Sequence, residues 1–255
     1  MSAGSLIVVA NLAAVAVHGV LRLAVERRWG VVEFGQVSLA FSVALLLTTA
    51  AHATGWIALP RLARTPPERW AEVHRLARDG TRGPLAAVVL LYLPLEVAMA
   101  RWLPDYRPAL LFLGLLLPLV VVESRWRIAS TGMMKVMGRL RTLLTLNLLA
   151  LGAAVLLALV FTLLLPSLTG IVLSLLGVTV LRSAVADVWL ARRLGTAWGE
   201  GLALDLVVVA GLLVALWLGG LPGAALGVVV VGAVSWWHRD ATAEVLTRLR
   251  RELAA

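Results

Sequence analysis

The chain has 255 residues, 61% of them hydrophobic and 15% charged, and its mean hydropathy is +0.94. Soluble domains average about half apolar and about a quarter charged residues, so this composition excludes an ordinary soluble protein and predicts an integral membrane protein. The net charge of +9 does not indicate a nucleic-acid partner, because the arginines lie between apolar runs and form no basic patch interleaved with aromatic residues.

Long apolar runs recur along the whole chain and predict an all-α, polytopic fold. About 20 apolar residues in a helix cross the hydrocarbon core of a bilayer. We expect eight transmembrane helices, at residues 6–25, 35–59, 84–100, 108–122, 142–165, 168–190, 202–218 and 222–237. The last two form a hairpin, so the chain divides into a six-helix unit (1–195) and a hairpin with a cytoplasmic amphipathic tail (196–255).

Positive charge is distributed unevenly between the connections. Seventeen of the 23 Lys and Arg residues fall in the even-numbered connections and the C-terminal tail, whereas four fall in the odd-numbered connections. Because Lys and Arg are enriched in cytoplasmic loops, this asymmetry predicts a cell-membrane protein with both termini in the cytoplasm.

The longest polar segment, residues 61–82, contains six arginines and separates the second and third predicted spans. Thr65 followed three residues later by Glu68 is typical of a capping box, and Gly80 is typical of a helix end. Apolar residues between them recur at helical spacing opposite charged ones. We therefore expect a short helix lying on the membrane surface.

Ionisable and polar residues inside a bilayer are costly, so those in the spans are candidate site residues. His18, Arg22 and Glu26 lie four residues apart on one face of the first span. They either line an aqueous cavity, in which Arg22 would bind a phosphate, or Arg22 and Glu26 pair with each other at the outer interface. Thr48 and His52 make the second span polar, and they either form a cavity wall or bond neighbouring helices.

Three further ionisable residues lie within later spans and are candidates for ion coupling. Glu96 is either a proton or cation site or the partner of Arg101. Arg182 and Asp187 are five residues apart on poorly aligned faces of one helix, so we expect each to find a partner on another helix. Asn147 is expected to make a packing contact.

No catalytic constellation emerges from the sequence. The loops are short and hold no cluster of Asp, Glu or His suited to acid, base or metal roles. The chain also contains no cysteine and no nucleotide-binding loop. We therefore expect no enzymatic activity, no metal and no cofactor, and a role in moving or holding a substrate.

Three stretches carry a family resemblance. They are FGQVSLAFSVALLLTTAAHATGWIALPRLAR at 34–64, WLPDYRPALLFLGLLLPLVVVESRWRI at 102–128, and the run at 133–147 that leads into the fifth span. Together they resemble the C-terminal half of bacterial polysaccharide flippases. These oligosaccharide-lipid exporters share a superfamily with the MATE drug exporters, and the resemblance covers about residues 5–195.

The resemblance implies two six-helix halves around a central cavity that opens alternately to either side of the membrane. It also implies transport of a polyprenyl diphosphate-linked oligosaccharide to the outer leaflet, with His18, Arg22 and His52 on the cavity. The chain has only half of the expected length. Besides membrane lipids, we therefore expect as partner a second six-helix half, from a homodimer or a separate subunit, which associates through the first two helices.

Three other interpretations of the chain stay open, and the first of them follows from its half length. The chain is alternatively a truncated remnant of such a flippase. It is alternatively a non-transporting membrane scaffold of polysaccharide biosynthesis, or a drug or cation exporter of the same superfamily.

Overall fold

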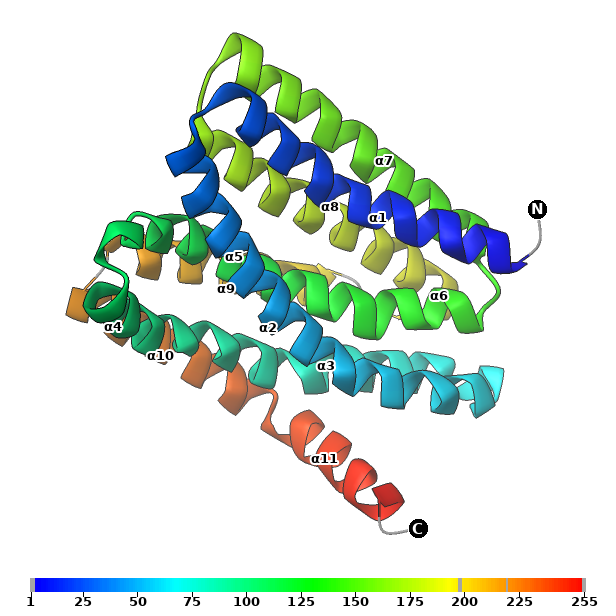
Figure 1. Cartoon of the computed structure of the whole chain (residues 1–255). Coiled ribbons are helices and arrows are strands. Elements are labelled where there is room, and N and C mark those ends of the chain that lie inside the picture. Colours follow the sequence, from blue (N-terminus) through cyan, green and yellow to red (C-terminus); the bar gives the residue numbers. More distant parts are fainter. Residues whose placement is uncertain (1–2, 197–198, 219, 254–255) are drawn as a thin grey trace.

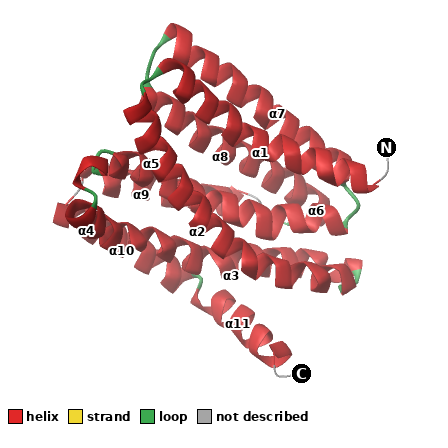
Figure 2. Cartoon of the chain, in the orientation of Figure 1, coloured by secondary structure: helices red, strands yellow, loops and turns green. Residues whose placement is uncertain are grey.

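The computed structural model describes residues 3–196, 199–218 and 220–253. Every regular element in this part of the chain is helical, and no strand occurs in it (Figure 2). The all-α prediction is therefore confirmed. The α-helices are α1 (Ala3–Arg28), α2 (Val31–Arg64), α3 (Trp70–Val88), α4 (Tyr92–Trp102), α5 (Ala109–Arg125), α6 (Gly132–Val136), α7 (Leu140–Leu159), α8 (Leu168–Leu194), α9 (Gly199–Leu218), α10 (Gly220–Trp237) and α11 (Arg239–Leu253).

Six of the described stretches are helices long and apolar enough to cross a membrane. They are Gly4–Arg28, Val31–Thr49, Pro67–Trp102, Ala109–Val136, Leu140–Leu164 and Leu168–Leu194. The two helices of the predicted hairpin are apolar but shorter, at Ala203–Leu218 and Pro222–Trp237. Length and composition thus support a polytopic, membrane-embedded protein, while the count of eight spans stays a prediction.

The helices form two groups on either side of α5 (Figure 1). On one side α1, α7 and α8 pack against one another, and on the other α3 packs against α10 and α11. Helix α2 crosses α5, and α9 pairs with α10 to form the hairpin. Helix α5 contacts members of both groups, so it is the element that connects them.

Helix α5 is the core of the molecule. In the apolar part of the stretch Ala109–Val136, which begins with α5, 83% of the residues are buried, compared with at most 50% in the other five long stretches. The large, fully buried side chains of this helix include Leu113, Leu116 and Leu117. Charged groups near the end of α5 therefore need partners from other helices rather than water.

The prediction of a separate short helix in segment 61–82 is wrong, because the helix found there continues beyond the segment. A 3₁₀ turn at Pro67–Arg69 leads into α3, and the helical path continues through a second 3₁₀ turn, Val89–Leu91, into α4. Its start has no side-chain cap hydrogen bond. Gly80 does not end the helix, because it lies inside α3, where a Cβ atom would come within 3.0 Å of the Ala241 carbonyl oxygen of α11. Its small size permits close packing of the two helices.

The fourth predicted span is longer than expected. Helix α5 continues past residue 122 to Arg125 and then passes through a π-helical segment, Trp126–Thr131, into α6. Arg125, which the charge count assigns to a loop, is buried. The partners of Arg125, described below, come from helices that are distant in the sequence. A sequence-based assignment therefore misses them and places this arginine outside the membrane.

Candidate functional site

The end of α5 and the π-helical segment after it carry three charged residues at alternate positions, Glu123, Arg125 and Arg127. Residues two apart on a helix point to nearly opposite sides, because each residue turns the helix by about 100°. Glu123 and Arg125 therefore face different neighbours and organise two separate polar networks. The π-helical segment that follows has wider turns than an α-helix, a feature that often occurs at functional sites.

Glu123 is the centre of the first network. It is 2% exposed and accepts hydrogen bonds from Nη2 of Arg182 and, at 2.9 Å, from Nε of Arg127. Nη1 of Arg182 donates to Oδ1 of Asn147 at 3.3 Å, and Nδ2 of Asn147 donates to the Ala10 carbonyl oxygen at 2.9 Å. This network ties α1, α5, α7 and α8 together.

Trp126 shields the first network from one side. The guanidinium of Arg182 lies 4.9 Å from the centre of the Trp126 ring, which is buried. The negative face of an aromatic ring attracts a cation, and this attraction is strongest where water is excluded. The arginine is thus stabilised by one carboxylate, one amide and one ring.

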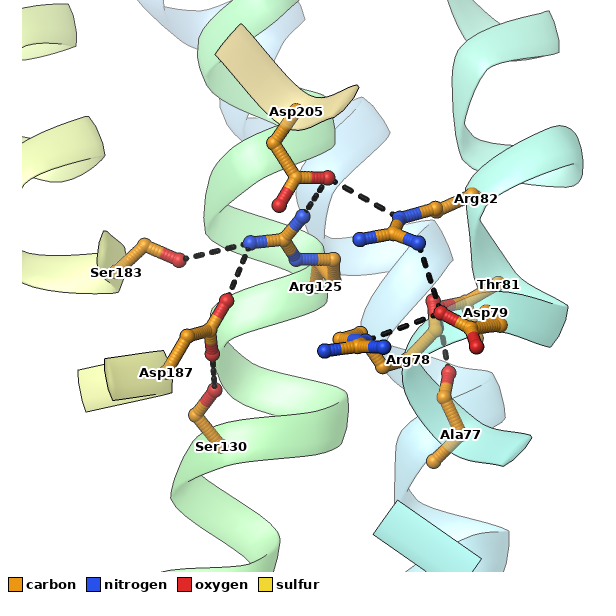
Figure 3. Close-up of polar contacts among 10 residues, drawn as sticks. All are labelled: Ala77, Arg78, Asp79, Thr81, Arg82, Arg125, Ser130, Ser183, Asp187 and Asp205. Atoms are coloured by element: carbon orange, nitrogen blue, oxygen red, sulfur yellow. Dashed lines mark hydrogen bonds and ion pairs between the residues drawn. The ribbon is translucent and has the colours of Figure 1, made fainter. Parts of the chain in front are cut away.

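Arg125 is the centre of the second network, shown in Figure 3. Its Nη2 donates to Oδ2 of Asp187 at 2.7 Å, and its Nη1 pairs with Oδ1 of Asp205. Ser130, in the π-helical segment, donates from Oγ to the other oxygen of Asp187 at 2.8 Å. Helices α5, α8 and α9 therefore meet at one buried guanidinium.

The second network extends into α3. Nε of Arg82 donates to Oδ1 of Asp205 at 3.1 Å, and Nη1 of Arg82 donates to Asp79 at 2.8 Å. Arg78 donates to the same Asp79 oxygen at 3.0 Å. Buried ion pairs offset the cost of desolvation only when their hydrogen bonds are good, and the loss of one partner is then expensive. Three arginines of α3 and α5 are held in this way by three carboxylates.

Two of the candidate residues find the partners expected of them. Arg182 and Asp187 each bond to α5, the first to Glu123 and the second to Arg125. The prediction of partners on other helices is confirmed. Their role in ion coupling stays a prediction. Asn147 makes the expected contact between helices.

The first-span candidates lie beside the Glu123 network. His18 is half-buried, with its ring edge-on to Phe41 at a centroid distance of 6.4 Å. It is within electrostatic reach of Glu123, Arg182, Arg127 and Arg22. Arg22 is half-buried, and among the described side chains no ion pair joins it to Glu26. The alternative in which these two residues pair with each other is therefore not observed.

Basic residues of α1, the π-helical segment and α6 lie near one another, and we call them the basic row. We use this name for Arg22, His18, Arg127 and Lys135. Each member lies within electrostatic reach of the next. The side chain of Arg127 is 39% exposed, and Arg22 and Lys135 are half-buried. Helix α2 packs against the π-helical segment and α6, which carry Arg127 and Lys135. The row thus combines cationic donors with partial accessibility.

The described polar side chains of α2 give little support to the predicted polar cavity wall. Thr48 is buried, and its hydroxyl donates to the Ala44 carbonyl oxygen of the same helix at 2.8 Å. Its donor is therefore engaged within its own helix. The side chain of His52 lies outside the described residues, so its place on a cavity stays a prediction.

Glu96 occupies a small cavity between α4 and the α9–α10 hairpin. The cavity has a volume of about 50 Å³, and Tyr92 is its other polar lining residue. No ion pair with Arg101 is present among the described residues, so that alternative is not observed. The described part of the chain also contains no group of three His, Cys, Asp or Glu side chains that could hold a metal ion.

Seven charged residues of the two networks are not among the candidates from the sequence. The loop count includes Arg78, Arg82, Arg125 and Arg127, and the sequence analysis does not single out Asp79, Glu123 or Asp205 as site residues. A detectable signal exists for Glu123 and Asp205, because Glu123 directly follows an apolar run and Asp205 lies inside the predicted span 202–218. No family model, curated protein or solved structure matches the chain, so the geometry of the basic row and the two networks is the basis for any functional conclusion.

Proposed function

We propose that the chain is a component of a membrane flippase that moves a polyprenyl diphosphate-linked oligosaccharide to the outer leaflet by alternating access. The observation that supports this most is the basic row, which places partly accessible cationic groups among helices long enough to cross a membrane. A diphosphate needs such donors, since guanidinium groups bind phosphate oxygens through paired, charge-assisted hydrogen bonds.

Arg22 is the best candidate for contact with the diphosphate. Unlike Arg127 and Arg182, it has no carboxylate partner among the described side chains. His18 lies one helical turn before Arg22, on the same face of α1. An arginine without a partner in an apolar layer is costly, and a ligand phosphate would remove that cost.

A second six-helix half is the proposed partner, with both termini of this chain in the cytoplasm. Large apolar side chains of α1 and α2 are exposed, and the clearest examples are Val8, Leu12, Val15, Leu45 and Leu46. Lipid or another helix would cover them. A substrate cavity requires that one side be closed by protein, which favours association through these two helices.

Reconstitution into vesicles tests this proposal. A fluorescent lipid-linked oligosaccharide is placed in the inner leaflet, and its appearance outside is measured with the chain alone and with a candidate partner half. Transport above the rate of protein-free vesicles is expected in at least one arrangement. A chain that binds polysaccharide-synthesis enzymes but never moves the lipid, with any partner half, would instead be the scaffold.

A further inference from the structure

A single carboxylate joins the α9–α10 hairpin to two buried arginines of the six-helix unit. Oδ1 of Asp205 accepts hydrogen bonds from Arg82 and Arg125, and both arginines are at most 6% exposed (Figure 3). The second oxygen of this carboxylate, Oδ2, is buried and has no hydrogen-bond partner among the described residues. One acceptor atom thus serves two guanidinium groups.

Among the side chains that the structure describes, the ion pairs given above for the second network balance in charge when Asp205 is included. The network consists of three arginines and three carboxylates, namely Arg78, Arg82, Arg125, Asp79, Asp187 and Asp205. Without Asp205, the other members would carry one excess positive charge. An uncompensated charge is costly in a buried place, so this position favours one negative charge.

Arg125 keeps one donor that Asp205 does not reach. Its Nε is buried and finds no hydrogen-bond acceptor in the described part of the chain. A cavity of about 20 Å³ is lined by the two arginines, by Asp205 and otherwise by Val and Leu side chains. This space is close to that of one water molecule. An anion therefore fits here only in place of the Asp205 carboxylate, not next to it.

We propose that Arg82 and Arg125 form a binding site for one oxyanion, a carboxylate or phosphate group, which the chain's own Asp205 fills in this conformation. The planar guanidinium matches the two oxygens of such a group, and phosphate offers one more acceptor than a carboxylate. An anion that takes this place displaces α9, so its binding is linked to the position of the hairpin. The site does not depend on the proposed transport function.

Removal of the internal ligand tests the proposal. Asp205→Ala is purified as the full chain, and its thermal midpoint is measured in sodium formate, phosphate and chloride at equal ionic strength. At about ten times its Kd, formate is expected to raise the midpoint by about 3–6 °C relative to chloride. The wild-type chain should not respond, because Asp205 already occupies the place.

Two control variants separate this effect from a general salt effect. Asp240→Ala removes an almost fully exposed carboxylate that lies 3.7 Å from Arg239, and no formate-specific rise is expected. Asp205→Asn leaves no space for an added anion and should also not respond. If Asp205→Ala does not survive purification in chloride, the recovery of folded protein with formate present is the measurement.

Nanodiscs of different lipid composition show whether the anion is a lipid phosphate or a soluble anion. Asp205→Ala is placed in nanodiscs of phosphatidylcholine with and without phosphatidic acid, and formate is then added to each. A higher thermal midpoint with phosphatidic acid alone indicates a lipid phosphate, whereas a higher thermal midpoint with formate alone indicates a soluble anion. Equal midpoints in all of these conditions, or the same response in the wild-type chain, overturn the proposal.

Discussion

The guanidinium of Arg182 is in direct contact with the carboxylate of Glu123 at the place where α8 packs against α5. Both groups are buried within stretches long enough to cross a membrane. Charged groups are rare in such stretches, and those present usually pair with one another. Their mutual dependence gives a direct test of the first network.

Arg182→Met is expected to destabilise the protein by about 3–5 kcal/mol, because it leaves a buried carboxylate with only Arg127 as a charged partner. Thermal unfolding in detergent measures this loss. The double variant Glu123→Gln with Arg182→Met should lose less than the sum of the two single variants. Arg193→Met, at an exposed position of the same helix, is the control and should change stability by less than about 0.5 kcal/mol. Additive losses would show that the two charges are not coupled.

Gly223→Ala is expected to open the α9–α10 hairpin, because an added Cβ atom would overlap with the backbone carbonyl oxygen of Ala215. Gly232→Ala in the same helix is the matched control, since no atom lies within 4 Å of its added Cβ. There, alanine should stabilise the helix by up to about 1 kcal/mol. Limited proteolysis of the hairpin and thermal midpoints of both variants provide the measurement. Equal behaviour of the two variants would contradict this packing.

The free energy of unfolding is expected to decrease as the pH is lowered, and His238, which directly follows α10, is expected to contribute to this decrease. Burial and the nearby Arg82 lower the pKa of His238 below its ordinary value of 6.5. The folded chain then holds the neutral ring, whereas the unfolded chain binds a proton near pH 6.5, so the stabilisation present above that pH is lost as the pH falls through it. Thermal midpoints at pH 8 and at about pH 5.5 should differ less in His238→Gln than in the wild-type chain. An unchanged difference would exclude a contribution from this histidine.

Arg22→Ala is expected to lower the flipping rate of a lipid-linked oligosaccharide at least about tenfold, because a charge-assisted hydrogen bond to phosphate is lost. Arg28→Ala is the control, since Arg28 lies on the same helix but is exposed and rests on the Trp29 ring at 5.9 Å. The vesicle assay compares both variants at matched protein incorporation. Normal transport by Arg22→Ala would remove this residue from the proposed site.

The apolar helices could be predicted from the sequence because their signal is local. A run of apolar residues indicates a span wherever it occurs, and all six long helices coincide with predicted ones. The boundaries of those helices could not be predicted as well. Arg125 and Gly80 read as a loop residue and a helix end, yet packing against distant helices keeps both positions inside helical structure.

The candidate site was only partly predictable for the same reason. Arg182 and Asp187 stood out because they interrupt a long apolar run, and the need for partners followed from their charge. The identity of those partners did not, since Glu123 lies 59 residues from Arg182 and Arg125 lies 62 residues from Asp187. Pairings at such separations depend on how α5 and α8 pack, which no short pattern in the sequence encodes.

The central position of α5 also constrains the order of events during synthesis. Arg125 leaves the ribosome well before Asp187 and Asp205, the two carboxylates that pair with it. Until α8 and α9 have been made, the end of α5 cannot reach its buried place without carrying unpaired charge. The nascent chain is therefore expected to hold this end of α5 at the membrane surface and to complete its core only after the later helices have entered.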